Sequence, residues 1–432
     1  MTPSAMKVIL SCLAIALCLP SALGQTKALG AKKPPPPPVA QIDPVTGLPS
    51  ISAAGAIVMD ADTGKVLWSK DADTQRYPAS TTKIMTALLL IEKCKPTDVI
   101  QAPADVEKVK EASMHLKPRE RVTAKDMLYA LMLRSANDGC YAVACHIGGS
   151  VEGFAKLMNE RAKSIGCTGT TFRNPNGLND PDHKTTPRDL ALIAREAMKR
   201  PEFRTVTRTQ KQVISRSLNQ EDLWMINKNR LLKYDPTVDG IKTGYTNPAG
   251  KCFVGSAVRN GYRLITVVMK SEDWAADTKV LLDWAYAAHE WKTYFRPGEI
   301  VAAPRIVRGG TSDEVALGVT RVGKSLVTKG SPAKVDFSLD VPDELLAPVQ
   351  RGQAVGYISF RDADGFAYRL PVVALIDVPA QTPVQAAVSR VDPWTLGGAA
   401  ALFGMAYLMR RKARKAGIQV QRGTSAPWVR YK

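Results

Sequence analysis

Three short motifs that together suit acyl transfer follow one another along this chain. A serine and a lysine stand one helical turn apart at Ser80 and Lys83, and a Ser-Ala-Asn triplet follows at 135–137. A Lys-Thr-Gly triplet comes third, at 242–244. A serine hydroxyl is a weak nucleophile until a neighbour takes its proton, and a lysine can do so when burial or a like charge keeps it neutral. The motifs therefore predict a serine acyl-transfer site whose base is lysine instead of histidine.

Each residue type suits one step of such a reaction. Ser80 is the expected nucleophile and Lys83 its base, because side chains three residues apart share a helix face. The positive charge of Lys242 is expected to help keep Lys83 neutral. The hydroxyl of Ser135 can pass a proton to a leaving amine, and the amide of Asn137 can hold the peptide bond of a substrate. Taken alone, the Ser-Ala-Asn triplet is also compatible with an ordinary helix-capping turn.

The Lys-Thr-Gly segment is expected to form a strand that docks the substrate. A strand ending in Gly244 lets an extended peptide lie alongside as an extra strand. Lys242 and Thr243 then offer a charge and a hydroxyl to a terminal carboxylate. The backbone N–H of Ser80, at the start of its helix, can contribute to an oxyanion hole.

The sequence around these motifs resembles the penicillin-interacting serine D-alanyl-D-alanine carboxypeptidases. The similarity includes Tyr77–Ala87, Phe172–Leu178 and Asn227–Leu232, and it is close over residues 46–292. The resemblance implies an α+β catalytic domain of the β-lactamase/D,D-peptidase type, in which helices pack on an antiparallel sheet. It also implies that the backbone N–H of Tyr245 is the second oxyanion donor.

The resemblance implies an activity as well. Such an enzyme removes the terminal D-alanine from peptidoglycan stem peptides through an acyl-enzyme on Ser80, and β-lactams acylate the same serine. No metal or organic cofactor is implied. A D,D-endopeptidase or a β-lactamase using the same acylation site, and a non-catalytic membrane-tethered module that binds the cell wall, stay open as alternatives.

The chain departs from the family pattern at one functional position. Members often carry an arginine shortly before the closing helix, where it holds the carboxylate of the substrate. This chain has Trp274 near that place, with Lys270 and Lys279 as the nearest basic residues. The family pattern therefore leaves open which residue recognises the terminal carboxylate.

Hydrophobic periodicity predicts the elements that position the motifs. Alternation around a turn at 62–64 predicts a hairpin, and apolar residues at helical spacing predict a helix from Ser80 and another after Thr123, its expected N-cap. Further helices are expected at 151–165, 187–199 and 278–289, and strands at 250–258 and 262–269. Interleaved helices and antiparallel strands are typical of the α+β class.

Composition divides the chain into successive segments. A basic start, a short apolar run and a small-residue site before Gln25 predict a cleaved export signal, and five consecutive prolines after it predict a stiff spacer. We expect a signal peptide at 1–24, a Pro-rich linker at 25–45, the catalytic domain at 46–292, an all-β domain at 293–378, a linker at 379–392, a membrane anchor helix at 393–409 and a basic cytoplasmic tail at 410–432.

The positive charge of the chain favours a membrane over nucleic acid. The net charge is +19, but residues 410–432 carry eight basic residues and no acidic one. They follow a stretch, 393–409, that has no charged residue and spans about 25 Å as a helix. A membrane span is preferred here over an interfacial helix, with the catalytic domain on the extracytoplasmic face.

Other chemistry-bearing residues are expected to be structural. Residues 318–325 fit the phosphate-loop pattern, but the strand-like sequence around them argues against nucleotide binding. His183 is expected to support the structure. The five cysteines after the signal peptide show neither a zinc-site spacing nor a disulfide framework.

Overall fold

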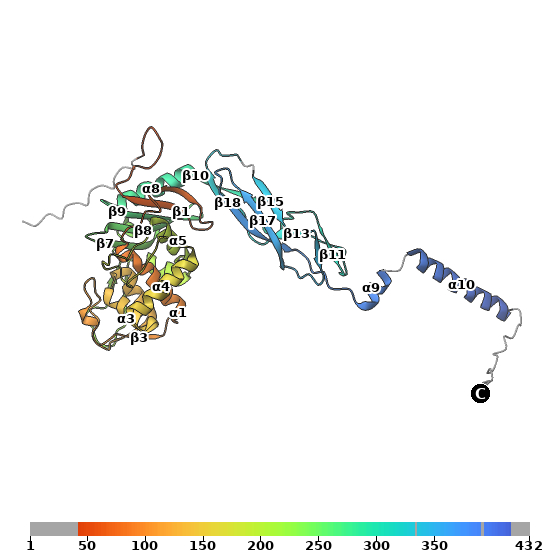
Figure 1. Cartoon of the computed structure of the whole chain (residues 1–432), viewed down its shortest axis with the longest axis horizontal. Coiled ribbons are helices and arrows are strands. Elements are labelled where there is room, and N and C mark those ends of the chain that lie inside the picture. The colour runs from red at the N-terminus through yellow and green to blue at the C-terminus, as the bar shows by residue number, and fades with distance from the viewer. Residues whose placement is uncertain (1–41, 333–334, 390–392, 416–432) are drawn as a thin grey trace, which may run out of the picture. The chain divides into compact units, whose positions relative to one another are not determined.

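The structure is a computed structural model that describes residues 42–332, 335–389 and 393–415 (Figure 1). The predicted signal peptide, nearly all of the Pro-rich linker and the end of the basic tail lie outside the described residues.

A five-stranded antiparallel sheet organises the catalytic part of the chain. Its strand order is β2-β1-β9-β8-β7, so strands from both ends of the segment meet in one sheet. The predicted hairpin is confirmed as its first two strands, and the predicted strands 250–258 and 262–269 are β8 and β9. The bounds are Gly55–Asp60 for β1, Val66–Lys70 for β2, Val238–Thr246 for β7, Gly250–Arg259 for β8 and Tyr262–Ser271 for β9.

Helices cover both faces of this sheet, as Figure 1 shows. Successive side chains of a strand point to opposite faces. In β1, Ala56 and Val58 join the apolar cluster formed with α8 (Trp274–Ala288), whereas Ile57 and Met59 join the larger cluster formed with the other helices. The expected α+β architecture of helices on an antiparallel sheet is confirmed.

The remaining helices and short strands of the catalytic part lie between β2 and β7 in the chain. Thr123 caps α2 as predicted, because its Oγ1 accepts a hydrogen bond of 3.1 Å from the N–H of Asp126. The helices are α1 (Lys83–Lys93), α2 (Ala124–Tyr129), α3 (Asn137–Gly148), α4 (Val151–Ile165), α5 (Pro187–Ala197), α6 (Pro201–Arg208) and α7 (Leu231–Tyr234), with helical turns η1 (Ala79–Thr82), η2 (Val106–Lys108) and η3 (Ala130–Arg134). The strands are β3 (Val99–Gln101), β4 (Arg121–Thr123), β5 (Lys211–Val213) and β6 (Trp224–Ile226).

Two predicted helices differ from the observed ones at their starts. The helix predicted from Ser80 begins as the tight turn η1 and becomes α-helical only at Lys83. The last helix starts at Trp274, four residues before the predicted start, because Asp273 caps it and accepts hydrogen bonds from the next turn. The first difference places Ser80 in η1 and Lys83 in α1, which follows directly, so the two residues stay one turn apart.

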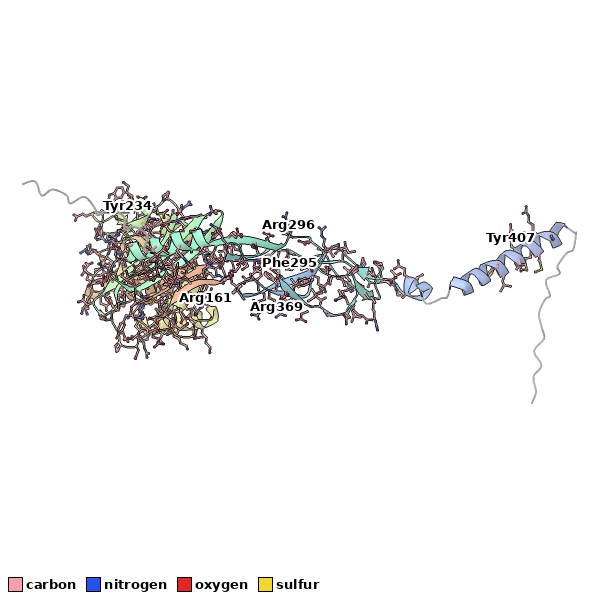
Figure 2. All side chains as sticks on the ribbon, turned by 90° about the horizontal axis from the view of Figure 1, so that it is seen from above. Arg161, Tyr234, Phe295, Arg296, Arg369 and Tyr407 are labelled. Atoms are coloured by element: carbon pink, nitrogen blue, oxygen red, sulfur yellow. The ribbon has the colours of Figure 1, made fainter. Side chains whose placement is uncertain are left out.

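The segment after α8 folds into small β-sheets, as its sequence predicts. Its core contains Phe360, and the partly buried Phe295, labelled in Figure 2, packs against it. The two ring centroids lie 5.7 Å apart. Residues 318–325 belong to β13 and β14 and the turn between them, so no helix follows them as in a phosphate-binding loop. The strands are β10 (His289–Phe295), β11 (Arg305–Arg308), β12 (Glu314–Val315), β13 (Leu317–Val319), β14 (Gly323–Thr328), β15 (Asp336–Asp340), β16 (Glu344–Leu346), β17 (Ala354–Arg361) and β18 (Ala367–Ala374).

The C-terminal segments differ from the prediction in two ways. The predicted linker 379–392 contains a short helix, α9 (Pro383–Ser389). The predicted membrane helix forms as α10 (Pro393–Lys415), but no helix in the described part of the chain is both long and apolar enough to cross a bilayer. The prediction of a span at 393–409 is therefore not supported, because the uncharged run is short and the helix continues into the basic residues that follow it.

Candidate active site

The serine–lysine motif brings a hydroxyl and an amine into contact. The turn η1 carries Ser80, and Lys83 opens α1 one turn later. The Nζ of Lys83 lies 3.0 Å from the Oγ of Ser80, 2.7 Å from the Oδ1 of Asn137 and 2.7 Å from the carbonyl oxygen of Asn176. This amine is completely buried. It therefore has two fixed oxygen acceptors in addition to the serine.

Burial makes both motif lysines weaker bases than ordinary lysines. It lowers the pKa of Lys83 to about 8; the charge of Lys228 acts in the same direction, whereas Cys140 and Asp138 oppose it. Burial also lowers the pKa of Lys242 well below its ordinary value, and the charges of Lys83 and Lys228 lower it further. The structure thus places the two lysines, 159 positions apart in the sequence, where their charges interact.

The Ser-Ala-Asn triplet lies where one helical segment ends and the next begins. Ser135 has a left-handed backbone with φ of 70°, which ends the turn η3, and Asn137 is the first residue of α3 instead of a loop residue. The side-chain amide of Asn137 is held from both ends, since Oδ1 accepts from Lys83 and Nδ2 donates to the carbonyl oxygen of Lys110 at 3.0 Å. Ser135 is largely buried, and its hydroxyl makes no hydrogen bond to any of the residues described.

Glycine at position 244 allows the Lys-Thr-Gly strand to lie close to Ser80. A Cβ atom there would lie 3.1 Å from the backbone nitrogens of Ser80 and Thr81 and from the carbonyl oxygen of Pro78. Such contacts are closer than most side chains tolerate, so any larger residue would require β7 and η1 to move apart by a few tenths of an ångström. The strand is also an edge of the five-stranded sheet, which leaves its outer side open to an extended peptide.

The predicted site residues converge on one cavity of about 580 Å³. Six of the eight line it, and the other two, Lys83 and Lys242, are buried. The predicted residues in the lining are Ser80, Ser135, Asn137, Thr243, Gly244 and Tyr245. Sequence reasoning missed further lining residues, among them Glu111, Lys228 and Lys251.

Of the residues that sequence reasoning did not assign to the site, Asp138 supports the Ser-Ala-Asn segment and Lys228 lines the cavity. Asp138 is buried at the start of α3 and accepts hydrogen bonds from Ser113 and from the backbone of Met114 and Leu116. Lys228 lies between two asparagines in a segment that the sequence identifies only as family scaffold. Nothing in the sequence of this segment indicates that the lysine lines a cavity. Only the fold brings these residues to the motifs.

His183 forms a hydrogen bond to η1, the turn that carries Ser80, in agreement with its expected structural role. Burial lowers its pKa to about 4, so the imidazole is neutral at pH 7. Its Nδ1 accepts a hydrogen bond from the backbone N–H of Arg173 at 3.0 Å, which leaves Nε2 as the donor to Oγ1 of Thr82 at 2.9 Å. The histidine thereby ties the loop at 172–178 to the turn that carries Ser80.

Trp274 occupies the cavity wall where the family pattern places an arginine. Its ring packs on Phe253 at 4.4 Å between centroids, and the guanidinium of Arg230 lies 5.2 Å from the ring centroid. Neither Lys270 nor Lys279 lines the cavity, and Lys279 instead pairs with an aspartate on its own helix. The two basic residues nearest in sequence are therefore not the substitutes for the arginine.

This fold and this arrangement of serine and lysine side chains are typical of serine acyl-transfer enzymes that use a lysine as the base. Residues 43–273 match the family described as D-alanyl-D-alanine carboxypeptidase, peptidase S11, and residues 290–380 match the C-terminal domain of penicillin-binding protein 5. The chain belongs to the D-alanyl-D-alanine carboxypeptidase family, as its motifs implied.

Individual relatives support this membership over most of the chain. The D-alanyl-D-alanine carboxypeptidase DacF of Bacillus subtilis is 31% identical over 352 residues, which are 79% of this chain and 90% of the relative. The D-alanyl-D-alanine carboxypeptidase DacC of Escherichia coli is 33% identical over 330 residues, which are 72% of this chain and 81% of the relative. The crystal structure of penicillin binding protein 5 from Haemophilus influenzae superposes with a TM-score of 0.65 at 28% identity, over 77% of this chain and 98% of that one.

Proposed function

We propose that this enzyme removes the terminal D-alanine from peptidoglycan stem peptides, with Ser80 as the nucleophile. The contact of 3.0 Å between Ser80 Oγ and the buried Lys83 amine is the observation that carries the proposal. The family relatives named as D-alanyl-D-alanine carboxypeptidases support the choice of substrate.

The surroundings of Lys83 favour proton transfer from the serine. The oxygens of Asn137 and Asn176 can only accept hydrogen bonds, so they orient two hydrogens of the amine. In the neutral amine the lone pair is then left for the hydroxyl of Ser80. A pKa of about 8 gives a base that is partly neutral near pH 7 and strong enough to accept this proton.

The catalytic steps follow from the positions of the other motif residues. Ser80 Oγ attacks the carbonyl carbon of the penultimate D-alanine while Lys83 takes its proton, and the N–H groups of Ser80 and Tyr245 stabilise the oxyanion. As the tetrahedral intermediate collapses, the amine of the last D-alanine leaves with a proton relayed through Ser135. Water then hydrolyses the acyl ester, which releases the shortened peptide and restores the Ser80 hydroxyl.

The cavity gives less support to a β-lactamase. Fast deacylation of that kind needs a carboxylate that activates water close to the ester. Of the described residues that line the cavity, Glu111 is the one carboxylate; its side chain is 70% exposed and contacts His115 at 3.2 Å. The loop at 172–178 contributes no carboxylate to the cavity lining; its carbonyl oxygens of Pro175 and Asn176 accept hydrogen bonds from Thr86 and Lys83.

The decisive experiment measures acylation and product together. The purified protein is incubated with labelled penicillin and, separately, with a peptide ending in D-Ala-D-Ala. We expect a covalent adduct and release of free D-alanine, and we expect Ser80→Ala to abolish both while circular dichroism stays unchanged. A penicillin adduct without D-alanine release would contradict carboxypeptidase activity and point to another use of the acylation site.

We further propose that the enzyme is exported and acts at the outer surface of the cytoplasmic membrane, with α10 lying in the interface. The helix exposes apolar side chains, among them Phe403 and Tyr407, which is 67% exposed (Figure 2), next to a basic run at 410–412. Exposed apolar residues beside basic ones suit the interface of an anionic bilayer.

Vesicle flotation tests this attachment. The full mature chain is expected to float with vesicles that contain anionic lipid, and less so at high salt, whereas a chain ending at residue 382 is expected to stay at the bottom of the gradient. Equal flotation of both proteins would contradict a role for α10.

A further inference from the structure

A lysine without a partner lies in the active-site cavity. Lys228 lines the cavity together with Ser80, Ser135 and Thr243. Within the described part of the chain, its amine makes no hydrogen bond and no ion pair. The second exposed lysine in the lining, Lys251, already has a hydrogen-bond partner, since its Nζ donates to the carbonyl oxygen of Glu272 at 2.6 Å.

The backbone on both sides of Lys228 is firmly held. The side-chain amide of Asn227 donates to the carbonyl oxygens of Thr207 and Thr209, and its Oδ1 accepts from the N–H of Asn229. The Oδ1 of Asn229 in turn accepts from the N–H of Leu231 at 3.1 Å. The segment therefore presents Lys228 to the cavity from a fixed position, which reduces the entropy lost when its amine binds a ligand.

The charges around Lys228 favour an anionic ligand. Its positive charge interacts unfavourably with Arg134, Lys83 and Lys242, and Glu111 is the acidic residue that offsets this. A carboxylate in the cavity would add a favourable interaction with every one of these cations. The terminal carboxylate of a D-alanyl-D-alanine peptide is such an anion, and it must lie on the leaving-group side of Ser80, near Ser135 and Thr243.

We propose that Lys228 holds the carboxylate of the terminal D-alanine, the function that the family pattern gives to an arginine where this chain has Trp274. The proposal rests on the proposed carboxypeptidase function and names the residue that makes that function specific for a free C-terminus. The hydroxyl of Thr243 is positioned to bind the same carboxylate. Trp274 contributes an apolar wall instead of a charge.

The test compares two peptides that differ only at the C-terminus. One ends in D-Ala-D-Ala with a free carboxylate, and the other carries a terminal amide. Because a hydrogen bond between charged groups is worth more than one to a neutral amide, we expect the wild type to show a kcat/KM about 10- to 100-fold higher for the acid. Lys228→Met is expected to reduce this ratio to about 3-fold or less, and Lys228→Arg to retain most of it.

The ratio separates recognition from chemistry. Lys228 also lowers the pKa of both motif lysines, Lys83 and Lys242, so its loss changes the rate of acyl transfer, but it does so equally for the two peptides. Lys251→Met is the matched control, since this lysine lines the same cavity and is expected to leave the ratio unchanged.

Three outcomes would overturn the proposal: an unchanged acid-to-amide ratio of kcat/KM in Lys228→Met, loss of this ratio in Lys251→Met, or equal rates for acid and amide in the wild type.

Acylation by benzylpenicillin and by its methyl ester provides a second measurement that does not require peptidase activity. If the wild type released no D-alanine, the proposed function would fail, while loss of the acid-to-ester preference in Lys228→Met would still support carboxylate binding by this residue.

Discussion

Replacing Lys83 with methionine is expected to lower kcat/KM for a D-Ala-D-Ala peptide by about 10²- to 10⁴-fold, the range for loss of a general base. Methionine fills a similar volume in the buried site but cannot accept the proton of Ser80. The penicillin acylation rate is expected to fall by a similar factor, because the same proton transfer precedes both reactions. The measurement is the second-order rate constant of each reaction at pH 7.5.

The pH dependence of the wild type provides an independent check on Lys83. Burial lowers its pKa to about 8, so the protonated form predominates below that pH and cannot accept a proton. The acylation rate should therefore fall as the pH drops below about 8, and Lys83→Met should lose this dependence. Lys279→Met, on the surface of α8, is the control and should behave as the wild type. A Lys83→Met enzyme that kept a tenth of the activity would contradict the role of this amine as the base.

The local geometry of the motifs could be predicted from sequence, whereas their convergence at one site is expected from the resemblance to the family. A spacing of three residues on a helix already places Ser80 and Lys83 together, and the largely apolar sequence of 250–258 and 262–269 indicates two strands, which are central in the sheet. The ends of α4 coincide with the predicted range because Ser150 and Gly166 cap it in the ways these residue types favour.

Residues whose function depends on tertiary contacts could not be predicted in this way. Lys228 follows the short strand β6, and its sequence surroundings do not distinguish it from a lysine in solvent. Only the packing of this segment brings it into the same cavity lining as Ser135. Composition does not show where α10 ends, so the uncharged stretch at 393–409 by itself predicts a span, whereas the helix continues to Lys415. The pairing of Glu120 with Arg216 gave no sequence signal either, since 96 residues separate them.

This buried ion pair is the basis of the second large prediction. Both side chains are fully buried, and the guanidinium of Arg216 binds the carboxylate of Glu120 through two hydrogen bonds of 2.9 and 2.8 Å. The same guanidinium donates to the carbonyl oxygens of Met114, His115 and Asp222. Four of its five N–H groups therefore join the loop at 111–120 to the segment at 215–222, and the fifth binds Asp222 within that segment.

Arg216→Met is expected to reduce the free energy of unfolding by about 3–5 kcal/mol, because it leaves the Glu120 carboxylate buried without a partner. Urea titration followed by circular dichroism measures this change. Arg369→Met is the control, since its pair with Asp340 has a similar distance of 2.9 Å but side chains that are 56% and 78% exposed. That substitution should cost about 1 kcal/mol or less.

Arg216→Met is also expected to lower the acylation rate at the active site. The loop at 111–120 carries Ala112, whose carbonyl oxygen accepts a hydrogen bond of 2.6 Å from the N–H of Asn137. Asn137 in turn orients the Lys83 amine, so loosening the loop should weaken acylation in a protein that is still folded. Equal stability of Arg216→Met and Arg369→Met would contradict this account. If Arg216→Met lost stability while the folded protein kept its full acylation rate, the ion pair would support the fold without positioning Asn137.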